Sequence, residues 1–169
     1  MNNESKQKQE ELAVFKSFMT VCEYPIVEST ITQENPPKPD IFCKLSNNFS
    51  LQIEMTNCID FQMAQRMNDK RVNDNERGGF CNSEPIESVI LSKNQKLKDG
   101  KYSKSADRFE LLVYLGLTPF WPYWKKSIPN FLEGFKSEML FDRIWIFRDD
   151  KINPKILWDL QKNPLKISF

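Results

Sequence analysis

The sequence of 169 residues contains no histidine. This absence excludes Ser-His-Asp hydrolysis, Cys-His proteolysis and general-base catalysis by an imidazole. The cysteines are few and scattered, with no CxxC pair, and without histidine they cannot complete a zinc site of the usual kind. They are Cys22, Cys43, Cys58 and Cys81. We expect them to be reduced thiols in a cytoplasmic protein, and we expect other residue types to carry the chemistry.

Glycine is scarce as well, and long apolar runs are missing. The chain has 5 glycines, 40% hydrophobic and 28% charged residues, which indicates a compact globular protein. We expect one domain over residues 1–169 that buries roughly 70% of the surface of the unfolded chain. No run of about 18 apolar residues is present to span a bilayer, and the polar start MNNESKQKQEE lacks the apolar core of a signal peptide. We therefore expect no membrane partner.

The net charge of +1 predicts no strong overall attraction to nucleic acid. Positive charge is nevertheless concentrated in residues 93–108, which carry a balance of +4. The charged residues there are Lys93, Lys96, Lys98, Lys101, Lys104 and Arg108 against Asp99 and Asp107. Such a segment either meets a polyanion or forms a solvated face, and the sequence leaves both interpretations open.

Residues 39–56, PDIFCKLSNNFSLQIEMT, are predicted to form two strands joined by a tight turn, because their apolar residues alternate with period two. In the second strand one face holds Leu51, Ile53 and Met55, and the other holds Gln52, Glu54 and Thr56. Burial of the apolar face places Asp40 and Glu54 together on the opposite one. Two carboxylates, with backbone oxygen, water and substrate phosphate, suit a hard cation such as Mg²⁺. The alternative is an ordinary surface hairpin whose polar residues face water.

Two predicted amphipathic helices each carry a charged residue in their apolar stripe. In residues 7–22, Glu11 shares a face with Val14, Phe15, Phe18 and Cys22. It either lies in the first turn, near the positive end of the helix dipole, or meets a cation.

In residues 85–97, Lys93 lies in the centre of a stripe formed by Ile86, Val89, Ile90 and Leu97. An inward lysine of this kind snorkels, pairs with a carboxylate or delivers a positive charge to a catalytic site.

The other elements follow from shorter signals. We expect strands at residues 24–32, 108–115 and 141–147, helices at 61–72, 130–140 and 154–161, and a polar insertion around residues 60–84. Residues 118–124, TPFWPYW, are predicted to form a rigid aromatic loop. This loop is either a stacking platform for bases or a hydrophobic lid over the core.

The predicted order of helix, three strands, helix and strand, with Pro39-Asp40 opening the second strand and Glu54-Met55-Thr56 late in the third, resembles a known family. It is similar to the restriction-endonuclease-like core of the PD-(D/E)xK nuclease superfamily, over about residues 11–115. Thr56 departs from the pattern, because the family usually has lysine there. Some members have this lysine relocated to the helix after the third strand, where Lys93 lies.

The resemblance implies an α/β fold with a central mixed β-sheet flanked by helices, extended here by a C-terminal helix-strand-helix elaboration. It implies Mg²⁺ or Mn²⁺ held by Asp40, Glu54, the Met55 carbonyl and Glu11. It implies Lys93 as the group that stabilises negative charge on the scissile phosphate. The expected activity is hydrolysis of phosphodiester bonds in DNA, with RNA as the alternative substrate, by an endonuclease or exonuclease.

A weaker likeness concerns Lys98 and Tyr102. Their spacing loosely resembles a glutamine-to-tyrosine motif of exonuclease branches of the same superfamily. The predicted helix end at Asp99-Gly100 lies between the two residues and argues against the same role.

Two other functions stay open. One is a catalytically inactive protein of the same fold that binds nucleic acid or protein, which the missing lysine at Thr56 favours. The other is a protein-interaction module anchored by the aromatic residues Phe120, Trp121, Tyr123 and Trp124. A homodimer or a larger protein assembly is compatible with each of these functions.

Overall fold

The computed structural model describes residues 3–58, 84–115, 124–149, 155–160 and 165–168. The helices are α1 (Asn3–Met19), α3 (Glu84–Lys98), α4 (Trp124–Phe135) and the short 3-10 helix η2 (Lys136–Glu138). The strands are β1 (Ile26–Gln33), β2 (Ile41–Leu45), β3 (Ser50–Asn57), β4 (Arg108–Tyr114), β5 (Arg143–Arg148), β6 (Lys155–Asp159) and β7 (Leu165–Ser168).

The strands form one seven-stranded sheet in chain order from β1 to β7. Strands β1, β2 and β3 are antiparallel, β3, β4 and β5 are parallel, and β5, β6 and β7 are antiparallel again. The expected mixed sheet flanked by helices is therefore confirmed. The expected order of helix, three strands, helix and strand is also present from α1 to β4.

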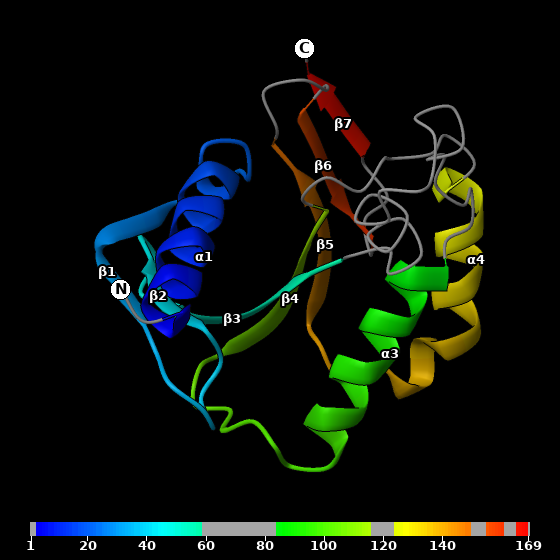
Figure 1. Ribbon diagram of the computed structural model, residues 1–169, viewed down its shortest axis with the longest axis horizontal. Helices are drawn as coiled ribbons and strands as arrows, with labels where there is room; N and C mark the ends of the chain where they lie inside the picture. Colours follow the sequence, from blue (N-terminus) through cyan, green and yellow to red (C-terminus); the bar gives the residue numbers. More distant parts are fainter. Residues whose placement is uncertain (1–2, 59–83, 116–123, 150–154, 161–164, 169) are drawn as a thin grey trace, which may run out of the picture.

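Helix α1 covers one face of the sheet, and α3 and α4 cover the other (Figure 1). On the α1 face, the ring of Phe18 packs edge-on against Trp145, with 5.3 Å between ring centroids. On the other face, Ile86 and Ile90 of α3 belong to a second buried core together with Leu111. The central strands are thus buried on both sides, as the apolar run at residues 108–115 predicts.

Strand β3 has the predicted alternation. Leu51, Ile53 and Met55 belong to the core beneath α1, so Gln52 and Glu54 face α3. This second face is covered, since Gln52 is 0% and Glu54 is 5% exposed. The alternative of a surface hairpin facing water is therefore wrong, because a helix packs over its polar side.

The C-terminal part differs from the expectation. The helix predicted at residues 154–161 is strand β6, which pairs antiparallel with β5, and β7 follows it. Burial of Leu157 and Trp158 on opposite faces explains the difference, because pairing with β5 stabilises a strand here whatever the local preference. The elaboration is therefore helix, strand, strand and strand, and the predicted helix-strand-helix arrangement is wrong.

Other predicted boundaries shift. The helix expected at residues 130–140 begins at Trp124 and ends at Phe135, and η2 follows it. Trp124 therefore belongs to a helix and not to the predicted aromatic loop, whose other residues lie outside the described part of the chain. The helix predicted at 61–72 and the polar insertion also lie outside it, apart from Glu84, which begins α3.

Among the described residues, no helix combines the length and the apolar character needed to cross a bilayer.

Helix α3 ends as its sequence predicts, at Asp99 and Gly100. Gly100 has φ of +68°, in the left-handed region that favours glycine. Its N–H donates to the Leu97 carbonyl at 3.1 Å, and the N–H of Lys101 donates to the Lys96 carbonyl at 2.9 Å. This pair of bonds is a Schellman motif, which reverses the chain and starts the loop leading to β4.

This helix end yields a prediction about stability. Gly100→Ala should lower the free energy of unfolding by about 1 kcal/mol, because alanine is strained at positive φ. Gly134→Ala, inside α4, is the matched control and should raise it by up to about 1 kcal/mol. At both positions an added methyl group meets no atom within 4 Å, so backbone conformation alone separates them. Urea denaturation measures both, and a Gly100 variant at least as stable as the Gly134 variant would contradict the assignment.

Candidate functional site

Asp40 directly precedes β2, and strand pairing places it opposite Glu54. The antiparallel register matches Ile41 with Ile53, so the residue before Ile41 faces the residue after Ile53. Asp40 Oδ2 accepts a hydrogen bond from the Met55 N–H at 2.8 Å, which fixes the carboxylate against β3. The two predicted acids therefore occupy neighbouring positions on adjacent strands. Met55 contributes its amide to this contact, and a ligand role for its carbonyl stays a prediction.

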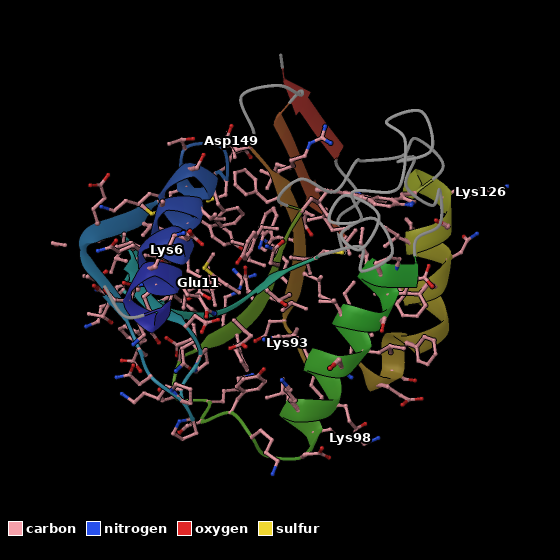
Figure 2. All side chains as sticks on the ribbon, viewed as in Figure 1. Lys6, Glu11, Lys93, Lys98, Lys126 and Asp149 are labelled. Carbon is pink, nitrogen blue, oxygen red and sulfur yellow. The ribbon has the colours of Figure 1, made fainter. Side chains whose placement is uncertain are left out.

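Glu54 meets two side chains that come from beyond β3. Lys93 Nζ lies 2.5 Å from Glu54 Oε1, and the Tyr102 hydroxyl donates to the same oxygen at 2.9 Å. The prediction that Lys93 projects inward from its helix is confirmed. In Figure 2 Lys93 lies on the side of α3 that faces α1, whereas Lys98 lies on the outer side of α3.

Glu11 approaches from α1, on the other layer. Because α1 begins at Asn3, Glu11 lies near the middle of the helix, and the interpretation of a first-turn residue near the helix dipole is wrong. Its side chain is buried, and Oε1 accepts a bond from Gln7 Nε2 at 2.9 Å. Figure 2 shows Glu11 on the inner side of α1, towards Lys93.

The three acids share one electrostatic environment. Burial raises the pKa of Asp40, Glu54 and Glu11 above their ordinary values. The charge of Asp40 further raises the pKa of the other two acids, and the ammonium of Lys93 lowers the pKa of all three. Lys8 of α1 acts in the same direction as Lys93 on Asp40 and Glu11. Added positive charge would therefore stabilise the ionised acids.

The predicted ligand set is only partly assembled. In the described part of the chain, no group of three or more aspartate, glutamate or cysteine side chains is placed to hold a metal ion. The structure thus brings Asp40 and Glu54 together, and it does not bring Glu11 into a three-acid group with them. Two carboxylates are still the number that a Mg²⁺ site commonly takes from the protein, with water and substrate supplying the other ligands.

Two polar residues of the site were missed by sequence reasoning. The helix end before Tyr102 argued against a role for this residue. The turn at Gly100 nevertheless reverses the chain, so that Tyr102 reaches Glu54. The second is Gln52, on the same face of β3 as Glu54. The signals were the spacing of Tyr102 from Lys98 and a glutamine at a buried strand position.

Gln52 fastens the loop that carries Tyr102. Its Oε1 accepts hydrogen bonds from the N–H groups of Ser105, at 2.9 Å, and Ala106, at 3.2 Å. Ser103 in the same loop donates its N–H to the Pro37 carbonyl at 2.9 Å, close to Asp40 in the chain. The loops that carry Tyr102 and Asp40 are therefore bonded to each other and to β3.

Half of the basic residues in the segment 93–108 form ion pairs with other described residues. Lys93 pairs with Glu54, Lys104 with Asp142 at 3.3 Å, and Arg108 with Glu110 at 3.2 Å. The remaining ones, Lys96, Lys98 and Lys101, are exposed and form no ion pair with any described residue. Within this segment, the lysines without an ion pair thus lie at the end of α3 and in the Tyr102 loop.

Another buried acid, Glu110, lies outside this site and connects strands of the sheet. Glu110 of β4 is 0% exposed and lies on the α1 face of the sheet. It accepts hydrogen bonds from the Tyr24 hydroxyl and Trp145 Nε1, both at 2.7 Å, and it pairs with Arg108. Burial raises the pKa of Glu110, and these partners oppose that effect. The cluster connects β4 to β5 and to the segment before β1.

In comparisons with protein-family models, curated proteins and solved structures, nothing matches this chain. The family resemblance therefore depends on the order of the elements and on the charged residues of the site. The geometry of Asp40, Glu54 and Lys93 becomes the main argument about chemistry.

The raised pKa of Asp40 predicts how stability depends on pH. The folded protein holds this proton more tightly than the unfolded chain, so the stabilisation is fully present below the unfolded pKa and is lost as pH rises through the folded pKa. Asparagine at this position can still accept the Met55 hydrogen bond, and it does not titrate. The free energy of unfolding of Asp40→Asn, relative to the unchanged protein, should therefore increase between about pH 4 and about pH 7.

Urea denaturation in EDTA measures this difference. A difference that stays flat or decreases over the same range would show that burial of the Asp40 charge carries no cost.

Proposed function

We propose that the protein is a metal-dependent nuclease that hydrolyses phosphodiester bonds in DNA, with RNA as the alternative substrate, on a restriction-endonuclease-like core. The observation that carries the proposal is the contact of Lys93 with Glu54 beside Asp40. These residues come from α3, β3 and the start of β2, and they combine the two oxygen ligands and the one cation that phosphodiester hydrolysis requires.

The donor atoms suit Mg²⁺ or Mn²⁺. The Met55 amide engages Oδ2 of Asp40, and both Lys93 and Tyr102 engage Oε1 of Glu54. No described residue donates a hydrogen bond to Oδ1 of Asp40 or Oε2 of Glu54, so each acid keeps one oxygen for a cation. Asp40 and Glu54 would hold the metal, with the Met55 carbonyl, water and substrate oxygen as further ligands, while Glu11 stays outside this group. When bound, the metal would polarise the phosphate and increase the acidity of the attacking water.

Lys93 supplies the positive charge that Thr56 lacks. Thr56 and Glu54 share the face of β3 over which α3 packs, so a lysine from α3 reaches the region that a lysine at position 56 would occupy. In the proposed reaction its ammonium stabilises the negative charge that develops on the phosphate oxygens. Tyr102 holds the Glu54 carboxylate in place.

The exposed lysines favour a polyanionic substrate. Lys101 is adjacent to Tyr102, and Lys96 and Lys98 lie in the last turn of α3, before the same loop. A nucleic acid backbone held along this loop would be close to Glu54. The near-neutral net charge is compatible with this, because attraction is then local and not a property of the whole surface.

The main test measures cleavage of plasmid, single-stranded DNA and RNA in Mg²⁺ or Mn²⁺. Asp40→Asn and Glu54→Gln should each reduce the cleavage rate by about 10²-fold or more, and Lys93→Ala by about 10²- to 10³-fold. Matched controls are Glu10→Gln, next to Glu11 but exposed, and Lys44→Ala, on the exposed side of β2. Both should retain the rate. Cleavage that survives the double change of Asp40 and Glu54 would exclude this site.

Tyr102→Phe tests the holding of Glu54. The ring would still pack against Phe109, with 5.8 Å between centroids, so only the hydroxyl bond is removed. We expect about a 10-fold lower cleavage rate, because a hydrogen bond to a charged group contributes about 1.5 to 3 kcal/mol. The free energy of unfolding in urea should fall by up to about 3 kcal/mol, because the same bond is lost from the folded protein. An unchanged cleavage rate would show that Tyr102 does not position Glu54 during the reaction.

The inactive binding protein is the second candidate, and Thr56 in place of lysine favours it. In that case binding to nucleic acid needs no metal and weakens steeply with salt, while no variant or metal yields cleavage. Calorimetric Mg²⁺ binding that is lost in Glu54→Gln would count against it. The third candidate, the aromatic anchor, loses one member, because Trp124 is 1% exposed inside the core; its other residues lie outside the described chain.

A further inference from the structure

A cavity of about 240 Å³ lies between α1 and the ends of β4 and β5. Helix α1 contributes Ala13, Val14 and Ser17, and the strand ends contribute Tyr114, Phe147, Arg148 and Asp149. Strands β4 and β5 are parallel, and Tyr114 and Arg148 are their last residues. In open α/β sheets, ligands bind outside the carboxyl ends of the strands, which is where this cavity lies.

Glu11 and the cavity share helix α1. Ala13 and Val14 follow Glu11 on the helix, roughly 3 to 5 Å further along its axis at about 1.5 Å per residue. Figure 2 shows Glu11 midway along α1 and Asp149 beside the far end of the same helix. Tyr114 lines the cavity, and burial together with the charges of Glu11, Asp40 and Glu10 raises its pKa to about 12.

The lining suits a planar, polar ring. Tyr114 and Phe147 are aromatic, and aromatic rings stack on nucleic acid bases. At the rim the Ser17 hydroxyl donates to Asp149 Oδ2, which places a hydroxyl and a carboxylate where the edge of a base would lie. The volume is below the range of about 300 to 1,000 Å³ of pockets for drug-sized ligands. One base fits this description better than a base pair.

We propose that this cavity binds the base of an unpaired nucleotide of the substrate strand. The inference rests on the proposed nuclease function and refines its substrate to single-stranded nucleic acid or a frayed end. A base that is stacked and paired in a duplex cannot enter a space of this size, so the strand must present it unpaired.

The first test measures binding without catalysis. Thymidine 5′-monophosphate and deoxyadenosine 5′-monophosphate are titrated into the protein in EDTA, with calorimetry and NMR chemical shifts as readouts. Ala13→Trp places a large ring at the rim of the cavity, and Ala13→Ser is its matched control. We expect the Trp variant to bind both nucleotides at least 10-fold more weakly than the Ser variant.

If Ala13→Trp fails to fold, the NMR chemical-shift changes that the nucleotides cause in the unchanged protein still test the proposal. They should concentrate at the amides of Ala13, Ser17 and Asp149. Shifts that concentrate instead at Glu28 and Ile31, in the larger cavity between α1 and β1, would overturn the proposal. So would the absence of binding, or equal binding by the two Ala13 variants.

The second test separates this site from the chemistry. With the unchanged protein, single-stranded DNA should be cleaved faster than blunt duplex. Ala13→Trp should raise KM for the single strand by a larger factor than it raises KM for bis(p-nitrophenyl) phosphate, since that small ester needs no base-binding cavity.

The outcomes distinguish the two proposals. Nucleotide binding that Ala13→Trp abolishes, without cleavage in any metal, would support the base-binding cavity and reject the nuclease. Cleavage that depends on Asp40 and Glu54, with equal KM for the two Ala13 variants, would support the nuclease and reject the cavity.

Discussion

Burial of the Glu54 carboxylate constrains the rest of the site. A carboxylate that is 5% exposed costs several kcal/mol in lost hydration unless partners compensate for it. The compensation comes from Lys93 of α3 and from Tyr102 in the following loop, which meet on one oxygen of the acid. Helix α3 must therefore place Lys93 over β3. It must also end at a point from which the following loop can bring Tyr102 back to Glu54. Gly100 and Gln52 satisfy the second condition, one by its φ and the other by its hydrogen bonds.

The parts of the fold with strong local patterns were predictable. The alternation in β3 and the apolar stripe of α3 each indicate which residues face the core, and so they placed Glu54 and Lys93 on surfaces that meet. The sequence could not show that a helix covers the polar face of the hairpin, because that depends on a contact between residues far apart in the chain. The prediction that Glu54 and Lys93 converge depended on this contact between α3 and β3.

The failures have equally specific causes. The polar residues before Glu11 carry no apolar period, so the predicted helix began late and put Glu11 in its first turn. The segment of β6 is short, and only its pairing with β5 decides between helix and strand. Glu110 is one acid within an apolar run, and nothing nearby in sequence reveals that Tyr24 and Trp145 bind it. Tyr102 could be placed only once the turn before it was known.

Charge balance connects the buried acids to the proposed chemistry. When ionised, Glu11, Asp40 and Glu54 carry three negative charges, while Lys8 and Lys93 supply two positive ones, so the group keeps one negative charge in a partly desolvated place. Burial is the largest cause of the raised pKa values of these acids, and the charge of Asp40 adds to it at Glu11 and Glu54. A divalent cation alone would reverse the sign to one positive charge, and one phosphodiester would then neutralise it. A monovalent cation would give neutrality without substrate, and so would leave no electrostatic attraction for a phosphate. The net charge of these five groups is thus compatible with the proposed binding of a divalent cation together with an anionic phosphodiester.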